Sequence, residues 1–224
     1  MFKNLVIFAA GNGGRMFPLT AYTPKAMVLC NNKTLIQASI EKFSKKNFKI
    51  HVTVGHKGDE LAKHVISLGV STVINTTGKG NAWWVYNSIL SSFDEPIIAL
   101  TCDSLMDVDL EALEKNYLNY KKPLCMLLPA KPIETIEGDY IHQENGLVKY
   151  LSRKDKTDIY ASGCQVLNPK KIIENTKSTD NFSNLWEQLI ELNQLFCTDF
   201  NASNWFSVDT IEQLKLYDSF KKKD

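Results

Sequence analysis

The chain has 224 residues, of which 44% are hydrophobic and 23% charged, and this composition is typical of a globular protein and excludes a largely disordered one. The formal net charge of +1 gives no overall attraction to nucleic acid or to an anionic membrane, so any affinity for phosphate must be local. This length suits one α/β domain or two small ones, and we predict a single domain over residues 1–224.

The cysteines and the apolar runs indicate the cellular compartment of the protein. The five cysteines are odd in number, widely spaced and without a CxxC pair, which argues against a zinc site or a disulfide framework and favours a reducing cytosol. The first residues do not have the pattern of a signal peptide, and no apolar run approaches the roughly 18 residues needed to cross a bilayer. We therefore expect a cytoplasmic protein that binds neither a membrane nor nucleic acid.

The first 120 residues alternate between β-branched runs and segments of helical period. Strands are expected in the runs NLVIFAA, KIHVTV, STVIN and PIIAL. Helices are expected over Thr34–Lys46, Asp59–Leu68, Ala82–Phe93 and Leu110–Tyr120. This alternation predicts a largely parallel sheet that is covered by helices on both faces.

The pattern changes after Pro123. The runs PLCMLLPA, GDYIHQENGLVKYLS and DIYASGCQVLN indicate strands joined by turns, and ENG is the clearest hairpin turn among them. Two helices are expected, over Pro169–Asn175 and Phe182–Asn193, then the run NWFSVDT and a last helix from Thr210. We therefore predict an α/β half over about 1–120 and a more antiparallel half over about 121–224, with ligands beyond the carboxyl ends of the strands.

A glycine-rich stretch, FAAGNGGRMFPLTAYTPKAM, follows the first expected strand. It fails both the dinucleotide pattern and the Walker pattern, because each requires glycine where the chain has Met16. Gly11 and Gly13 still let backbone N–H groups approach an anion, while Arg15 and Lys25 add two cations. Two interpretations stay open at this point: a cradle for a triphosphate, or a strand-to-helix turn whose basic side chains are only solvated.

The same stretch resembles the sugar-phosphate nucleotidyltransferase motif LAAGxGxRMxPLTxxxPKxM. In that family the glycine loop surrounds the NTP phosphates, and the lysine lies between the triphosphate and the incoming phosphate. The resemblance therefore implies catalytic roles for Arg15 and Lys25. A second run, GKGNAWWVYNSIL, resembles the family's helix start that contacts the nucleotide, and its two tryptophans are either core residues or part of the acceptor pocket. The implied nucleotide-binding residues are Ala9, Ala10, Gly11, Gly13, Arg15, Lys25, Gly80 and Asn81.

Two aspartates stand at the ends of expected strands, in IIALTCDSLMDVDL and NWFSVDTIEQL. Without further evidence, an aspartate after a strand is more often an N-cap or turn residue, which would explain Asp103, and Asp209 would be explained as a helix cap. The runs resemble the family's GD and WxDVDTxEDL motifs, whose aspartates hold the metal, so the resemblance implies that Asp103 and Asp209 bind Mg²⁺. Cys102 and Ser207 depart from these motifs. The four histidines show no metal-binding spacing such as HExxH.

The later strands carry the expected acceptor side. YASGCQVLNP resembles the family pattern YxGxxVLxP around Gly163, and YLSRK stands where a family lysine meets the acceptor phosphate, which implies Lys154. The resemblance extends from residue 5 to residue 214. It implies a Rossmann-like three-layer α/β sandwich with a mostly parallel mixed sheet, in which about 1–120 binds the nucleotide and about 121–224 binds the acceptor.

The implied activity is that of a Mg²⁺-dependent nucleotidyltransferase of the pyrophosphorylase type. It would transfer NMP from an NTP to a small phosphorylated acceptor, releasing pyrophosphate. The acceptor expected from the family is a sugar 1-phosphate, and the product an NDP-sugar for surface polysaccharide or envelope synthesis. A cytidylyltransferase acting on a non-sugar phosphate and a catalytically silent sensor of nucleotide sugars stay open as alternatives. The oligomeric state also stays open, and a homodimer is one of the alternatives.

Overall fold

The computed structural model describes residues 2–221, and their contacts form two compact units that are interleaved along the chain. The first unit contains residues 3–78, 100–105 and 206–221, and the second contains residues 2, 79–99 and 106–205. Neither unit is one of the contiguous halves expected around residue 120. The assignment of 1–224 as a single domain stays a prediction.

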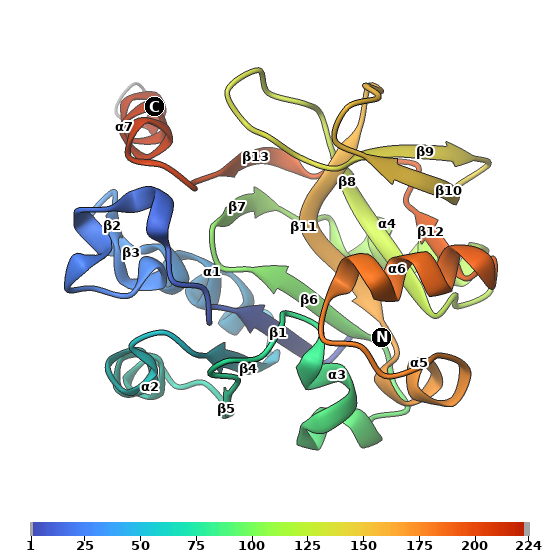
Figure 1. Ribbon diagram of the computed structural model, residues 1–224, viewed down its shortest axis with the longest axis horizontal. Coiled ribbons are helices and arrows are strands. Elements are labelled where there is room, and N and C mark those ends of the chain that lie inside the picture. The colour runs from blue at the N-terminus through green and yellow to red at the C-terminus, as the bar shows by residue number, and fades with distance from the viewer. Residues whose placement is uncertain (1, 222–224) are drawn as a thin grey trace. The chain divides into compact units, whose positions relative to one another are not determined.

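The first unit is built on parallel strands. Strand β1 (Asn4–Phe8) pairs with β4 (Lys49–Val54), and β4 pairs with β5 (Thr72–Asn75), all in parallel (Figure 1). β6 (Ile97–Thr101) contributes only its last residues to this unit, and just beyond it the Cys102 amide donates a hydrogen bond of 3.0 Å to Phe8 O. The carboxyl ends of β1 and β6 are therefore neighbours.

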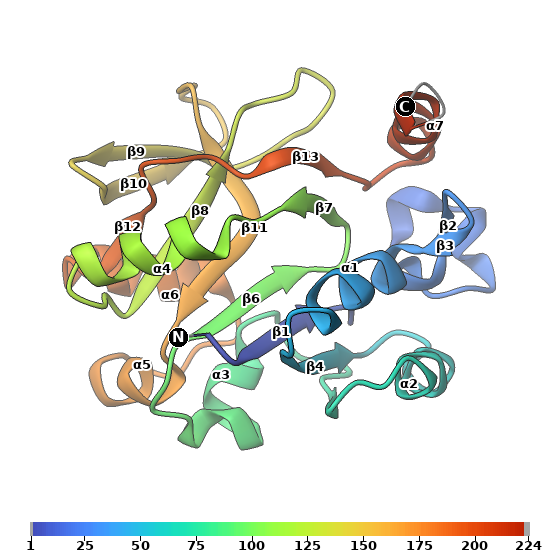
Figure 2. The same cartoon turned by 180° about the vertical axis from the view of Figure 1, so that it is seen from behind.

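Two amphipathic helices of the first unit pack against these strands. α1 (Leu35–Ser44) lies against β4, in front of it in Figure 2, and α2 (Gly58–Ser67) contacts β4 and β5. The Thr34 hydroxyl caps α1 by accepting from the Gln37 amide at 3.2 Å. Both helices agree with the expected ranges to within two residues. The remaining elements of this unit are β2 (Leu29–Cys30), β3 (Lys33–Thr34), α7 (Ile211–Lys221) and three 3₁₀ turns, η1 (Gly14–Met16), η2 (Leu19–Ala21) and η3 (Lys25–Met27).

The second unit has a mixed sheet in the order β6-β11-β8-β12-β10-β9. β8 (Cys125–Ala130) runs antiparallel to β11 (Tyr160–Leu167) and parallel to β12 (Leu195–Cys197). β9 (Tyr140–Glu144) and β10 (Leu147–Ser152) form the expected hairpin, in which Asn145 and Gly146 both have positive φ, at 52° and 83°. The Asn-Gly turn was therefore correctly predicted.

Helices cover both faces of the sheet in the second unit. α6 (Phe182–Glu191) lies in front of it in Figure 1 and packs on β10 and β12, while α4 (Leu110–Asn119) lies in front in the reverse view of Figure 2. The other elements are α3 (Trp83–Asn87), η4 (Ile89–Ser92) and α5 (Pro169–Asn175). The short strands β7 (Ser104–Asp107) and β13 (Ser203–Ser207) each belong partly to both units.

One expected helix is wrong in the structure. The segment Ala82–Phe93 breaks at Ser88, whose backbone is extended with φ −114° and ψ 174°. The Ser88 hydroxyl accepts from the Leu90 amide at 3.2 Å and so caps the turn η4. A serine that offers the backbone a local partner thus interrupts an otherwise helical pattern.

Within residues 2–221, no helix combines the length and the apolar character that crossing a bilayer requires.

His51 on β4 provides a test of the packing in the first unit. Its side chain is buried, and Nε2 donates to Asn4 Oδ1 at 3.0 Å. Burial, and secondly the charge of Lys49, lower the pKa of His51 from 6.5 to about 4. As pH falls, His51 is protonated in the unfolded chain at a higher pH than in the folded protein. We therefore expect the free energy of unfolding to fall as pH drops from 6.5 towards 4.

The measurement is urea unfolding of the wild type and of His51→Gln across this pH range. In His51→Gln the free energy of unfolding should depend less on pH than in the wild type. In the control His56→Gln, a change at an exposed residue, it should depend on pH as in the wild type. Identical pH profiles for wild type and His51→Gln would contradict the assignment.

Candidate functional site

Four charged side chains from three distant segments meet in the first unit. Lys25, in the turn η3, donates from Nζ to Asp103 Oδ2 and, at 2.6 Å, to Asp209 Oδ1. Arg15 Nη2 lies 2.8 Å from the same Asp209 oxygen. The Lys25 side chain is only 11% exposed, the two aspartates are 21% and 17% exposed, and Arg15 is 62% exposed. The fold thus brings together the two predicted catalytic cations and the two predicted metal ligands.

The backbone around the aspartates fixes where their carboxylates point. Asp103 follows β6, and its carbonyl accepts from the Val208 amide at 2.9 Å, so the two aspartate segments are bonded to each other directly. At the start of α7 the Thr210 hydroxyl accepts from the Gln213 amide at 3.2 Å. The Gln213 side chain accepts in return from the amides of Thr210 and Asp209, at 3.0 and 2.7 Å.

This capping box shows that Thr210, rather than Asp209, caps α7, and the role of Asp209 as a metal ligand stays a prediction. Thr210 caps the helix, so the Asp209 carboxylate is left to contact Lys25 and Arg15, and its other oxygen accepts from Ser207 Oγ at 3.3 Å. Asp103 does lie in a turn between β6 and β7, but its carboxylate bonds to Lys25.

The glycine loop is shaped by close packing against Lys25. Gly13 has φ +62°, and a Cβ on it would lie 2.7 Å from Lys25 Cβ and 3.0 Å from Thr20 Cγ2. Thr20 also donates from its hydroxyl to Gly13 O at 3.0 Å. Any other residue at position 13 would therefore push the lysine away. By contrast, a Cβ on Gly11 would have no neighbour within 4 Å.

The residues before the loop are held by strand β4 and its continuation. The Ala9 amide donates to Thr53 O at 3.1 Å, and Ala10 O accepts from the His56 amide at 3.1 Å. A Cβ on Gly55 would lie 2.7 Å from Ala10 O, so only glycine permits this approach. Ala9 and Ala10 thus anchor the start of the loop.

The electrostatics of the cluster favour its charged forms. Burial alone would lower the pKa of Lys25, but Asp103 and Asp209 outweigh it, and the net pKa is raised. Burial would raise the pKa of Asp209, yet the charge of Lys25 and its hydrogen bond bring the pKa below the usual range. Burial raises the pKa of the adjacent Cys102 to about 12, so this thiol stays protonated at neutral pH.

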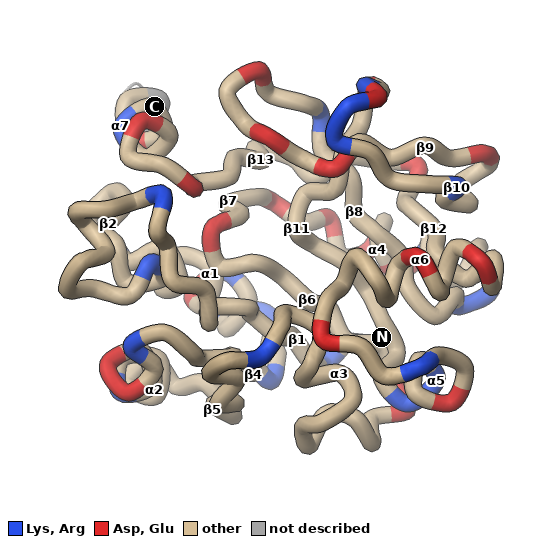
Figure 3. Tube along the Cα trace, in the orientation of Figure 1, with Lys and Arg blue, Asp and Glu red and all other residues tan. Residues whose placement is uncertain are grey.

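Basic and acidic residues are intermixed along the trace (Figure 3), so positive charge at the loop is a local property of Arg15 and Lys25.

The remaining predicted nucleotide residues lie in the second unit. A Cβ on Gly80 would lie 2.1 Å from Asp180 O, so glycine is required there. Asn81 Oδ1 accepts from the Phe182 amide at 2.9 Å and so bonds to the first residue of α6. Of the two tryptophans, Trp84 is fully buried in the core. Trp83 is half-buried, with the Lys79 ammonium 5.7 Å from its ring centre.

The predicted acceptor residues also lie in the second unit. Gly163 has φ 85° and stands in the β-bulge where the β11–β8 register shifts between Ala161 and Cys164. Lys154 is exposed, and its amide donates to Ser152 Oγ at 3.1 Å. The structure thus gives Gly163 a clear backbone role, while the roles of both residues towards an acceptor stay predictions.

Sequence reasoning missed several residues that support the cluster. Lys57, with its Nζ, donates to Thr20 O at 3.1 Å and to Ala21 O, and so holds the segment that leads to Lys25. No local pattern indicates this contact. The Thr210–Gln213 capping box, in contrast, follows the spacing S/T-x-x-E/Q and could have been found from the sequence.

The donor set at the cluster suits a hard divalent cation. Among the described residues there is no group of three or more His, Cys, Asp or Glu side chains that could hold a metal ion alone. Asp103 and Asp209 offer carboxylate oxygens that converge on one point, the Lys25 ammonium. Mg²⁺ is commonly held by one or two carboxylates, with substrate phosphates and water completing its shell, and the residues present fit that pattern.

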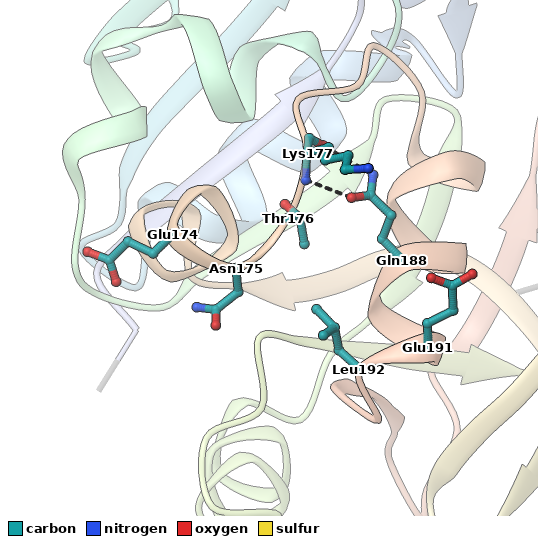
Figure 4. A pocket seen from close by; sticks show the side chains of 7 residues that line it. All are labelled: Glu174, Asn175, Thr176, Lys177, Gln188, Glu191 and Leu192. Carbon is teal, nitrogen blue, oxygen red and sulfur yellow. Dashed lines mark hydrogen bonds between the residues drawn. The ribbon is translucent and has the colours of Figure 1, made fainter.

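A separate cavity of about 380 Å³ lies in the second unit beside α5 and α6 (Figure 4). Among its lining residues, the Lys177 amide donates to Gln188 Oε1 at 2.7 Å, and Gln188 Nε2 donates back to Lys177 O at 3.1 Å. The cavity contains none of the predicted site residues.

Together, these strands and flanking helices form an α/β fold with a mostly parallel mixed sheet. The fold agrees with solved structures of low sequence identity. The inositol-1-phosphate CTP transferase from T. maritima is 18% identical, with a TM-score of 0.81 over 99% of this chain and 96% of that one. UDP-glucose pyrophosphorylase complexed with UDP-glucose is 17% identical, with a TM-score of 0.79 over all of both chains.

The sequence model of the family described as Nucleotidyl transferase matches residues 4–216, and the chain belongs to that family. The chain is also similar to the mannose-1-phosphate guanylyltransferase catalytic subunit beta of Drosophila melanogaster, at 21% identity over 214 residues. The D. pseudoobscura protein of the same description is 22% identical over 211 residues. Each alignment covers 88% of this chain, which spans only 57% of the length of these relatives.

Gly13→Ala tests the packing of the loop. The change adds a Cβ at positive φ against Lys25, and we expect it to lower the free energy of unfolding by about 1–3 kcal/mol. Gly11→Ala is the matched control, because a Cβ there meets no neighbour, and it should stay within about 0.5 kcal/mol of wild type. Urea unfolding measures both, and equal stabilities for the two variants would refute the packing argument.

Proposed function

We propose that this protein is a nucleotidyltransferase that moves NMP from an NTP to a small phosphorylated acceptor, with release of pyrophosphate. The convergence of Arg15, Lys25, Asp103 and Asp209 carries the proposal. Cations that can contact phosphate oxygens, beside carboxylates that can hold a divalent cation, suit in-line attack on a phosphoryl centre. Membership of the nucleotidyl transferase family supports the same reaction class.

Each residue of the cluster has a distinct role in this proposal. Lys25 and Arg15 bind the phosphate oxygens and stabilise the negative charge that develops as pyrophosphate leaves. Backbone amides of the loop from Gly11 to Gly13 bind the triphosphate, since glycines let an anion approach the chain. Asp103 and Asp209 would hold Mg²⁺, which neutralises phosphate charge when bound. No side chain needs to act as a covalent nucleophile, because the acceptor phosphate supplies the attacking oxygen.

We propose a sugar 1-phosphate as the acceptor and an NDP-sugar as the product. The similarity to proteins described as mannose-1-phosphate guanylyltransferase subunits supports a sugar phosphate. Gly80 and Asn81 are proposed to lie near the nucleotide, and Lys154 and Gly163 near the acceptor, as the family resemblance implies.

One observation favours a second acceptor class. Asn81 occupies a position where the family has threonine, and its side-chain oxygen bonds to the amide of Phe182. A bulky Trp83 follows, and the acceptor-phosphate motif around Lys154 is altered. A cytidylyltransferase that uses a non-sugar phosphate, such as phosphocholine, is therefore the alternative.

A panel experiment separates these possibilities. Pyrophosphate release is measured with each of the common NTPs, paired with sugar 1-phosphates and with amino-alcohol phosphates. We expect turnover with one NTP and a sugar 1-phosphate. Turnover only with CTP and a non-sugar phosphate would replace the first acceptor class by the second. Binding of a nucleotide sugar without any turnover would instead identify a silent sensor and overturn the proposal.

Asp103→Asn tests the proposed metal ligand. The change keeps the shape of the side chain but removes its charge, and we expect kcat to fall by about 10²–10³ in Mg²⁺-dependent turnover. Asp59→Asn is the control, since Asp59 is an exposed residue of the same unit on α2. Circular dichroism checks that both variants are folded. Near-wild-type turnover by folded Asp103→Asn would remove Asp103 from the metal site.

A further inference from the structure

The two carboxylates proposed to hold the metal are the ones that Lys25 contacts. Its Nζ bonds to Asp103 Oδ2 and to Asp209 Oδ1, and Arg15 also lies against Asp209 Oδ1. The second oxygen of Asp209 accepts from Ser207 Oγ at 3.3 Å. Lys25 Nζ therefore bridges one oxygen of each aspartate, and the remaining oxygen of Asp209 bonds to Ser207.

We propose that Lys25 and the divalent cation bind this carboxylate pair alternately, and that Lys25 leaves it only when phosphate oxygens offer the ammonium a new partner. This proposal rests on the function proposed above and assigns a regulation to the same site. Its consequence is that the carboxylate pair binds a divalent cation weakly by itself and strongly together with a polyphosphate. Metal and nucleotide binding are then coupled through one side chain.

The geometry explains why the two cations exclude each other. A Mg²⁺ ion bound to oxygens of both aspartates at about 2.0–2.1 Å would lie between them, in the space that the ammonium occupies. An ammonium and a divalent ion at that spacing would repel strongly in a partly buried site. Since the Lys25 side chain is only 11% exposed, water cannot easily separate the two charges.

The structure also limits how Lys25 can leave. Its backbone is held in the turn η3, where the Val28 amide donates to Lys25 O at 3.0 Å, and its Cβ is packed against Gly13. The outer part of the side chain can rotate about its remaining bonds. The ammonium can therefore exchange partners while the backbone of the loop stays in place.

The test uses Mn²⁺ alone as the probe, titrated into the full chain and followed by electron paramagnetic resonance. Lys25→Met removes the competing ammonium, and we expect it to bind Mn²⁺ at least about tenfold more tightly than wild type, the equivalent of one charge-assisted hydrogen bond. Lys25→Arg keeps a cation and should bind as weakly as wild type. Lys33→Met, which breaks an exposed ion pair with Glu41, should change nothing.

A second measurement covers the case in which Lys25→Met is less stable. Because the variant leaves the two carboxylates facing each other, Mg²⁺ should raise its melting temperature by more than it raises that of wild type. Adding Asp103→Asn to Lys25→Met should abolish the gained Mn²⁺ affinity. Together these variants assign the effect to the carboxylate pair.

The outcomes distinguish this inference from the proposed function. Equal or weaker Mn²⁺ binding by folded Lys25→Met would overturn the exchange, even if the wild type turns over its substrates. Absence of Mg²⁺-dependent turnover in the substrate panel would overturn the proposed function, whatever the Mn²⁺ affinities are. Tighter binding in Lys25→Met and unchanged binding in Lys25→Arg would support the exchange.

Discussion

The arrangement of the first unit depends on one buried lysine and the two carboxylates that receive it. An ammonium with so little exposure is costly unless its charge is matched, and Lys25 is matched twice, by Asp103 and Asp209. The same contact is required by the carboxylates, because two negative charges at close range would otherwise repel each other. Segments that lie 78 and 184 residues from Lys25 in sequence are tied to it by these bonds.

Backbone hydrogen bonds bring the segments that carry Asp103 and Asp209 close to each other. β1 and the end of β6 are neighbours, so Asp103 emerges next to the glycine loop. The amide of Val208 bonds to Asp103 O, and the capping box at Thr210 keeps the carboxylate of Asp209 from serving as a helix cap. The hydrogen-bonded backbone therefore positions Asp103 and Asp209, and their ion pairs with Lys25 add to that arrangement.

Glycine has different physical roles in the two units. Gly13 is required because its missing side chain makes room for Lys25, so this glycine determines where a charged group lies. Gly163 adopts the positive φ of a β-bulge, and Gly80 allows the close approach of Asp180 O. Both glycines are therefore explained by the backbone itself. A sequence motif alone does not distinguish a glycine that the backbone conformation requires from a glycine that makes room for a neighbouring group, because both are written as glycine. The stereochemistry at each position explains why these three residues are glycine.

The sequence by itself determined the features that depend on neighbouring residues. The helical period located α1 and α2, the Asn145–Gly146 pair predicted the hairpin, and the glycine loop with Arg15 and Lys25 led to the prediction of a phosphate site. Only the tertiary structure decided that Ser88 ends a helix, that the three-residue strand Leu195–Cys197 runs parallel to β8, and that Lys25 lies between its two aspartates. Local preferences can be read over a few residues, but strand pairing and the matching of buried charges depend on segments far apart in the chain, which are brought together only by folding.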